Sequence, residues 1–527
     1  MQTTSNATLF QTSYSEALGA YRARKAVHTS GLVSPNDASS TLTANQRYGY
    51  PIHLNPNFGT AVVENPDDLA VEGSGADGGR YRVLDMKVDE ERWIWTSEAG
   101  GVVRQVDVES GVVRAVYRGA KAPVPGFDFI TTEGGGKLLV TGSWDRAIRV
   151  YRVVDRNDDD DKVVYPTPVL TVPNAMDDFI KCVHVFLSDG KPYIATAGSD
   201  KSIIVWDASP LLNSSTPTTL RSLHQSKPHL RPINTLSSLT TLRGTTHLYS
   251  ADSMGRILEH TLNPKSLRLE VLREIQGFST AVYDLKLGFA RVDESDSANW
   301  KEDEFVSEVK EDDEGERFRL VGEIWACSGD KSAAGYRLSP SLQPSSGKSS
   351  SKTIPLGTQP PLSTPYIHLP HTDFVKSILP LPLFPTTNLS SIITGGSDEH
   401  LHIYPTPSSP PILIEAHWHE LTSLALYIRP PSPNSPILPP SSTPEVWIIS
   451  ASLDASIRRF NLATLPSFPP PQLVKPSPDD SEKPHQQQWN QYSIPPTAHS
   501  KLPTDDATQM TAEEEAELAE LMDSDDN

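Results

Sequence analysis

With 527 residues, 37% of them hydrophobic, and a negative mean hydropathy, the chain is expected to be soluble and long enough for one large domain or two to three ordinary ones. No apolar run approaches the roughly 18–20 residues of a membrane span, and the start of the chain shows no secretory signal, so we expect a cytoplasmic or nuclear protein without membrane contact. The two cysteines, Cys182 and Cys327, form neither a disulfide framework nor a CxxC zinc motif. The net charge is −20, and the sequence has no basic stripe of the kind that direct nucleic-acid binding requires.

The first predicted element is a short helix within residues 13–27, SYSEALGAYRARKAV. Ser13 and Glu16 form a capping box, and helix-forming residues with three basic side chains follow. We expect this helix to lie on the surface, with binding to a partner as the alternative. Residues 31–79 are rich in Gly, Asn and Pro, and TAVVE (residues 60–64) is the only strand candidate there.

Seven copies of one unit follow, each with an apolar strand, a tight turn of small or acidic residues and a strand of alternating polarity. Such repetition determines the fold of the whole chain, because one unit alone cannot bury its apolar faces. In chain order the copies are SEAGGVVRQVD (97–107), GSWDRAIRVYR (142–152), TAGSDKSIIVWD (196–207), SADSMGRILEH (250–260), SGDKSAAGYRL (328–338), GGSDEHLHIY (395–404) and SASLDASIRRF (450–460).

A second feature precedes most of these units, where a turn residue is followed four positions later by an aliphatic residue that opens another strand. Three units have a histidine in this place, and three have a degenerate residue. The histidines are His229, His371 and His417, and the degenerate residues are Ala120, Met176 and Phe278.

The resulting order is an outer strand, a Gly/His turn, two apolar strands, an Asp turn and an amphipathic strand, which is the pattern of WD40 repeats. Residues 80–474 therefore resemble a WD40-repeat β-propeller, although only Trp206-Asp207 carries the dipeptide that names the family. The resemblance implies an all-β, seven-bladed propeller. We expect it to be flanked by an N-terminal extension, residues 1–79, and a disordered acidic tail with a short helical motif, residues 475–527.

A propeller must also close its ring, because closure removes exposed strand edges. TAVVE (60–64) and PPQLV (470–474) are the two candidates for the closing strand, and the sequence does not decide between them.

In this family the turn Asp accepts hydrogen bonds from the turn backbone and from the preceding His. We interpret these Asp and His residues as structural, because no nucleophile and third partner accompany them in a catalytic arrangement. Where the His is missing, we expect an incomplete hydrogen-bond network. Five units keep the Asp, at Asp145, Asp200, Asp330, Asp398 and Asp454, and the other two have Ala99 and Met254 there.

The resemblance also assigns the loops to two faces, because connections between the first and second and between the third and fourth strands of a blade emerge on one face. The four long insertions fall in these connections, at residues 155–162, 291–317, 339–365 and 429–444. The opposite face is expected to have short loops and little charge, which suits the docking of a partner. Its predicted contact residues are Trp144, Phe179, Phe374 and Trp418, with packing between blades as the alternative.

Two segments carry almost all of the net charge. Residues 291–317 hold twelve acidic and four basic residues, and residues 503–527 hold ten acidic residues and no basic one. We expect such runs to be solvated, disordered chain, with an acidic interaction motif as the alternative. Residues 511–523, TAEEEAELAELMD, combine a capping box with an apolar stripe, which predicts a helix that forms on docking. The stripe consists of Leu518, Leu521 and Met522.

No catalytic, cofactor or metal motif is found: GSGADG (73–78) matches GxGxxG, but a strand and not a helix is expected to follow it. We predict a non-enzymatic scaffold or adaptor in a multiprotein complex, which docks protein partners on the compact face and through the acidic tail. The alternatives are a non-catalytic subunit of an RNA-processing, chromatin or ubiquitin-ligase complex, an acidic chaperone of basic proteins, and a hydrolase that acts at the central channel. Self-association is left open.

Overall fold

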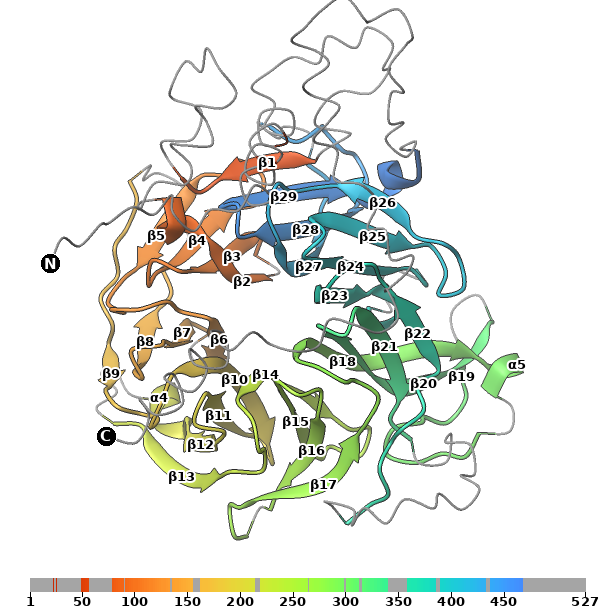
Figure 1. The fold of residues 1–527 in the computed structure, drawn as a ribbon, viewed down its shortest axis with the longest axis horizontal. Coiled ribbons are helices and arrows are strands. Elements are labelled where there is room, and N and C mark those ends of the chain that lie inside the picture. Colours follow the sequence, from red (N-terminus) through yellow and green to blue (C-terminus); the bar gives the residue numbers. More distant parts are fainter. Residues whose placement is uncertain are drawn as a thin grey trace, which may run out of the picture. The chain divides into compact units, whose positions relative to one another are not determined.

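The computed structural model describes Arg22, Lys25 and residues 49–55, 78–89, 91–132, 135–154, 162–213, 219–263, 265–297, 300–311, 315–339, 358–384, 389–432 and 437–467. These residues form seven antiparallel sheets arranged radially (Figure 1), and each sheet is built on a path of four strands. The predicted all-β, seven-bladed propeller is therefore confirmed. Within the described ranges, no helix is long and apolar enough to cross a membrane.

Blades 1 to 4 follow one another in the chain, and each runs from its inner to its outer strand. Blade 1 consists of β2 (Val83–Val88), β3 (Trp93–Glu98), β4 (Val103–Asp107) and β5 (Val113–Tyr117). Blade 2 consists of β6 (Gly126–Thr131), β7 (Lys137–Gly142), β8 (Ile148–Arg152) and β9 (Leu170–Val172). Blade 3 consists of β10 (Ile180–Ser188), β11 (Lys191–Gly198), β12 (Ile203–Asp207) and β13 (Arg221–Ser226). Blade 4 consists of β14 (Ile233–Thr240), β15 (Thr246–Asp252), β16 (Ile257–Leu262) and β17 (Leu269–Ile275).

Blades 5 to 7 complete the ring, and the last blade takes its outer strand from the beginning of the chain. Blade 5 consists of β18 (Val282–Asp293), β20 (Arg317–Ser328), β21 (Ser332–Arg337) and β22 (Ile367–Pro370), with β19 (Lys310–Glu311) paired to β20. Blade 6 consists of β23 (Val375–Pro380), β24 (Ile392–Gly396), β25 (His400–Tyr404) and β26 (Ile412–Glu415). Blade 7 consists of β27 (Leu421–Arg429), β28 (Glu445–Ser452), β29 (Ser456–Asn461) and β1 (Tyr50–His53).

Short helical segments lie in the connections. They are α4 (Ser209–Asn213), α5 (Glu294–Ser297) and the 3₁₀ segments η2 (Gly78–Tyr81), η4 (Leu381–Leu383) and η6 (Leu462–Ser467). Of the predicted helix at residues 13–27, only Arg22 and Lys25 are described, and both are helical.

The first strand of each blade lies at the centre of the ring, where it contacts the first strands of its two neighbours. The contacting pairs are β2 with β6, β6 with β10, β10 with β14, β14 with β18, β18 with β23, β23 with β27 and β27 with β2. The ring is thereby continuous.

The closing strand is β1, which pairs antiparallel with β29. Ile52 and Leu54 are buried there beside residues of blades 1 and 7, so the strand joins the beginning of the chain to its last blade. The strand also contains Pro51, which an outermost strand tolerates because one of its edges needs no ladder hydrogen bond. The two candidates from the sequence, residues 60–64 and 470–474, lie outside the described residues.

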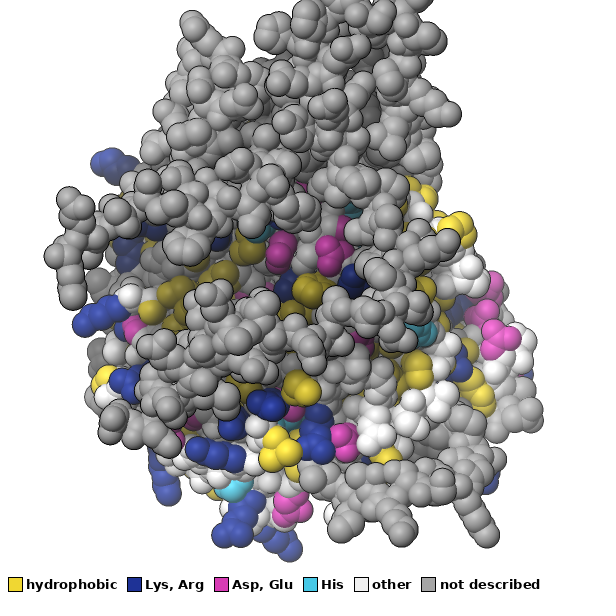
Figure 2. Space-filling view, viewed as in Figure 1, with side chains coloured by type: hydrophobic (Ala, Val, Ile, Leu, Met, Phe, Trp, Pro, Cys, Tyr) yellow, Lys and Arg dark blue, Asp and Glu magenta, His cyan; other side chains and the backbone are white. Residues whose placement is uncertain are grey.

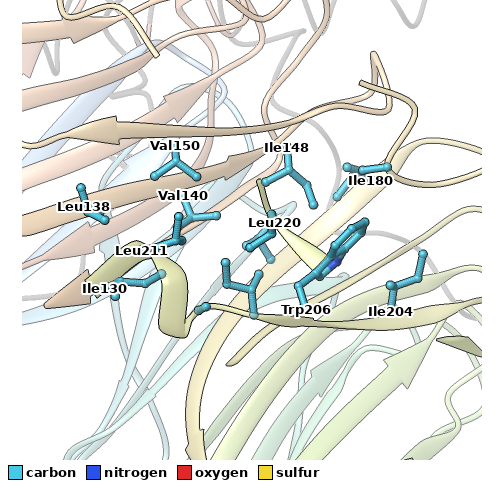
Figure 3. Packing of buried hydrophobic residues seen from close by; sticks show 14 of the residues in the cluster. Ile130, Leu138, Val140, Ile148, Val150, Ile180, Ile204, Trp206, Leu211 and Leu220 are labelled. Carbon is cyan, nitrogen blue, oxygen red and sulfur yellow. The ribbon is translucent and has the colours of Figure 1, made fainter. Parts of the chain in front are cut away.

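The core is divided into clusters that join neighbouring blades. Figure 3 shows one of them, in which side chains of blades 2 and 3 pack against each other. Ile148 and Ile180 are fully buried in it, and the indole of Trp206 donates a hydrogen bond to Thr196 Oγ1 at 3.0 Å. Since both faces of a blade are covered in this way, strands of the repeats are apolar on both sides.

The acidic insertion of blade 5 is more ordered than predicted. β18 and β20 are twelve residues long each and continue pairing to Asp293 and Phe318. Phe305 is only 1% exposed and packs beside the His247 ring at 5.5 Å between ring centroids. The expectation of solvated, disordered chain at residues 291–317 is therefore wrong for the described part, because an aromatic residue anchors it to the core.

Candidate functional site

One face of the propeller carries the turns between the second and third strands of every blade, together with the connections that precede every inner strand. We call it the turn face. The predicted structural Asp and His residues and the predicted aromatic contact residues all belong to these two kinds of connection.

All seven turns reverse through one residue with a left-handed backbone, a conformation that glycine adopts at least cost. These residues are Gly101, Arg146, Lys201, Gly255, Lys331, Glu399 and Ala455. Glycine stands there in the two turns that lack the Asp. The residue before Gly101 is Gly100, so Gly100, and not Ala99 as predicted, takes the place of the turn Asp in blade 1.

In blade 7 the predicted pair is complete. His417 Nδ1 and Asp454 Oδ2 lie 2.9 Å apart, and the His417 Nε2 lies 2.8 Å from Ser450 Oγ. Asp454 also accepts hydrogen bonds from the backbone of Trp418 and Ser456. Burial lowers the pKa of His417; burial would raise that of Asp454, but His417 and the hydroxyl of Ser456 hold the pKa of the carboxyl well below its usual range.

In blade 2 an arginine replaces the missing histidine. Arg149 donates two hydrogen bonds to the carboxylate of Asp145, at 3.0 and 2.7 Å, while the backbone of Lys121 and Ala147 donates two more. The expectation of an incomplete network beside Ala120 is therefore wrong. A guanidinium on the third strand fills the same role from the other side of the turn.

In blade 4 the carboxylate stands two positions before the place that the turn Asp has in other blades. His229 Nδ1 lies 2.9 Å from Asp252 Oδ2, and Asp252 accepts hydrogen bonds from the backbone of Met254 and Arg256. Blade 1 has Glu98 in the equivalent place, and its carboxylate lies 2.5 Å from Arg104 Nε. Burial raises the pKa of Glu98 to about 7, although Arg104 acts in the opposite direction.

In blade 6 the histidine and the aspartate do not meet directly. His371 Nε2 lies 2.8 Å from Thr394 Oγ1, whereas the carboxylate of Asp398 lies 2.5 Å from His402 Nε2. The two imidazole rings of His371 and His402 are 4.9 Å apart between centroids.

The turn aspartates of blades 3 and 5 bind serines within their own turns. Asp200 accepts hydrogen bonds from the backbone and hydroxyl of Ser202. Asp330 accepts from the hydroxyl of Ser332 and from the backbone of Ser279. These carboxylates are occupied by structural donors.

Two of the predicted aromatic contact residues meet on the turn face. Trp144 of blade 2 and Phe179, which precedes blade 3, stack with ring centroids 5.6 Å apart and planes inclined by 21°. They remain 38% and 47% exposed. Phe374 (42% exposed) lies on blade 6, and Trp418 on blade 7 is half-buried beside Arg458, so the structure does not gather all four in one patch. Leu518, Leu521 and Met522 lie outside the described residues.

A cavity of about 450 Å³ lies at the centre of the ring, lined by residues from all seven inner strands and by Trp144. It is more charged than the sequence indicated. Lys286 Nζ lies 3.1 Å from Asp284 Oδ1, and Lys87 lies 2.7 Å from Asp128 beside the cavity. Asp284 and Lys286 lie on one strand, β18, whereas Lys87 and Asp128 come from the inner strands of blades 1 and 2, so no single motif reveals this set of charges.

Two helical residues near the beginning of the chain contribute their side chains to the turn face at blade 6. Arg22 Nε lies 2.7 Å from Glu399 Oε1, and Lys25 Nζ lies 3.1 Å from Glu399 Oε2. The Lys25 and Glu399 side chains are only 2% and 6% exposed, and Lys25 also lies 3.6 Å from Glu415. This acidic part of the face is therefore neutralised by the chain itself.

Two hydrophobic residues of the turn face were not predicted. Leu230 is 75% exposed and Met254 is 55% exposed. The sequence does hold a signal for Met254, because an apolar residue stands there in place of the turn Asp. Among the residues that the structure describes, no group of three or more His, Cys, Asp or Glu side chains could hold a metal ion.

The comparisons with known proteins agree with this geometry. A family model described as WD domain, G-beta repeat, matches residues 167–207, which cover the outer strand of blade 2 (β9), the connection into blade 3 and that blade's first three strands. No curated protein matches the chain.

Proposed function

We propose that this chain, a seven-bladed WD40-repeat β-propeller protein, is a non-enzymatic scaffold that binds partner proteins on its turn face. The stacked pair of Trp144 and Phe179 carries the proposal, since both aromatic side chains remain exposed on the turn face and Trp144 also lines the central cavity. Aromatic residues of this kind supply much of the binding energy of protein interfaces. Their backbone is held by the hydrogen-bonded turns, so binding orders no loop.

The environment of the titratable groups supports a binding role. His417 and Asp454 are both buried and bound to each other, and they lack an exposed nucleophile in hydrogen-bond reach. Asp284 in the cavity is bound to Lys286 and to the hydroxyl of Ser377. Membership of a multiprotein complex in the cytoplasm or nucleus, and a second contact through the acidic tail, are parts of the same proposal.

The test compares the companions that the full-length protein recovers from its native cells. Trp144→Ala with Phe179→Ala should reduce the recovery of specific companions at least tenfold, because truncation removes both aromatic contacts. The matched control is Tyr165→Ala with Leu187→Ala, since these side chains are 55% and 57% exposed at the opposite face, in the connection from β8 to β9 and near the end of β10. Equal recovery with the turn-face variant would reject the assignment of this surface.

A broad hydrolase assay of the purified chain distinguishes a scaffold from an enzyme. A scaffold gives no turnover above background. Turnover that is lost in Asp284→Asn would place chemistry in the central cavity and would contradict the proposal.

A further inference from the structure

A groove of about 370 Å³ opens on the turn face between blades 4 and 5. Leu230, Met254 and Phe278 form its apolar part, and Leu230 and Met254 are the two most exposed large hydrophobic side chains of this face. Hydrophobic side chains that gather in an exposed groove mark an interaction site more often than single exposed ones do.

The charged side chains of the groove are two arginines and the two carboxylates of Asp252 and Glu274. Arg231 lines the groove without a carboxylate partner among the described residues, and Arg256 shares its wall with Glu274, which it contacts at 2.8 Å. The carboxylates of Asp252 and Asp330 nearby are already bound by His229 and by turn donors. On the face drawn in Figure 2, Lys and Arg side chains gather beside exposed hydrophobic ones over the part of the ring that holds β10 to β17.

We propose that the acidic segment at residues 511–523 of the same chain docks in this groove as a helix. The proposal rests on the proposed function, because it names an occupant for the same face. Leu518, Leu521 and Met522 are spaced to form one stripe, and six of the ten other positions of the segment are acidic. An apolar stripe flanked by carboxylates complements an apolar groove in which the guanidinium group of Arg231 has no carboxylate partner among the described residues.

The charges of the two ends of the chain support this choice of groove. The basic residues Arg22 and Lys25 already occupy the acidic part of the turn face at Glu399. Arg231, in the groove between blades 4 and 5, is left for an acidic segment. Residues 503–527 carry ten acidic residues and no basic one.

The connecting chain is long enough. Between Ser467, the last described residue, and Thr511 lie 43 residues, which span at most roughly 140–155 Å when extended. A compact domain of the propeller's size has a radius of gyration of about 22 Å. A flexible tether of this kind gives an effective concentration on the order of 1 mM, so a groove affinity of the same order keeps about half of the molecules occupied.

Zero-length crosslinking of the full-length chain with a carbodiimide tests the proposal, because it joins carboxylates to amines in contact. We expect tail crosslinks to Lys227 and Lys331, which belong to the connections beside the groove, at least tenfold more often than to Lys191 on the opposite face. Leu518→Ser with Leu521→Ser and Met522→Ser should abolish this preference while keeping every charge.

The complementary variant is Leu230→Ser with Met254→Ser, and its matched control is Leu187→Ser on the opposite face. The groove variant should lose the preference, and the control should keep it. Equal crosslinking of Lys191 and Lys227 in the unmodified chain would overturn the proposal, as would a preference that survives both serine variants. In a mixture of ¹⁵N-labelled and unlabelled chains, crosslinks between the two isotopes would instead assign the groove to a second copy and overturn docking within one chain. In either case, loss of companions in the Trp144 and Phe179 variant would leave the scaffold function standing.

Discussion

At each turn of the turn face, one residue reverses the backbone and its neighbour stabilises the reversal. Ala455 has a φ of 63°, and the carboxylate of Asp454 before it accepts the backbone hydrogen bonds of this turn. Where the Asp is missing, as before Gly255, the residue is glycine. A Cβ added at Gly255 would lie 2.4 Å from the carbonyl oxygen of Phe278, so no larger residue fits. Carboxylate and glycine are thus two solutions to one local constraint.

Replacing Asp454 by Asn should lower the free energy of unfolding by about 2 kcal/mol, since a hydrogen bond to a charged group contributes about 1.5–3 kcal/mol. The side chain keeps its shape, but one donor among His417, Trp418 and Ser456 faces an amide nitrogen. Urea denaturation measures the change. Asp177→Asn is the control, because the Asp177 side chain is 76% exposed, and its effect should stay within about 0.5 kcal/mol. Equal midpoints for the two variants would contradict the structural role.

The pH dependence of stability should carry a contribution from Glu98. Its folded pKa of about 7 exceeds the ordinary value of 4.5 because the carboxyl is buried. The contribution is therefore complete below pH 4.5 and is lost as the pH rises to about 7, when the folded protein must release the proton. Glu98→Gln removes this dependence. Relative to the variant, the parent protein should lose up to roughly 3 kcal/mol between pH 4.5 and 7, as measured by denaturation at each pH. A constant difference between the two proteins over this range would refute the prediction.

Among the elements, the blades depend on one another, because each buries its faces only against its neighbours. The strand that closes this arrangement is β1. It is four residues long, comes from the N-terminal part of the chain, and covers the edge of β29. Ile52 in its middle is 7% exposed and packs in the cluster that joins blades 7 and 1. A small strand thus stabilises the two blades at which the chain begins and ends.

Ile52→Ala should lower the free energy of unfolding by about 2–4 kcal/mol, because it removes buried methyl groups and leaves a cavity. Thermal unfolding and resistance to protease around β1 are the measurements. Leu413→Ala serves as the control, since Leu413 is also on an outermost strand but is 43% exposed. If both variants were equally stable, β1 would not be the strand that closes the ring.

Elements with a repeated pattern were predictable from the sequence, and elements without one were not. The seven strand–turn–strand units were found because alternating polarity and a turn of small residues recur in each. β1 was missed because YPIH shows neither signal. The ordered structure within residues 291–317 was missed because their many charged residues predict disorder, and the buried Phe305 that anchors them is a single residue. At the site, the exchange of His for Arg149 and the shift of the carboxylate to Asp252 depend on distances in space that spacing in the sequence does not contain.

For the whole molecule, the turn face is divided into an ion-paired part and a part with exposed apolar side chains. Its part at blade 6 holds Glu399, which the basic side chains of Arg22 and Lys25 neutralise. Its part at blades 2 to 5 presents the exposed Trp144 and the groove beside Leu230. The area around Glu399 is therefore covered by Arg22 and Lys25 of the same chain, and a partner that binds the turn face contacts the remaining area.

Limited proteolysis of the full-length protein tests this division. Lys25 is only 2% exposed on its side chain, so trypsin should cleave after Lys25 slowly in the parent protein. Glu399→Gln removes one charge of a buried ion pair. Breaking such a pair costs enough free energy to shift the equilibrium between docked and released Lys25 at least tenfold toward the released state. We expect cleavage after Lys25 to accelerate by at least that factor, while the melting temperature changes little because the backbone of Glu399 keeps its hydrogen bonds in the turn. Glu420→Gln is the matched control on the same face, since its carboxylate lies 3.9 Å from Lys376. Cleavage at the same rate in both variants would show that Glu399 does not hold Lys25, and the acidic part of the face would then be open to partners.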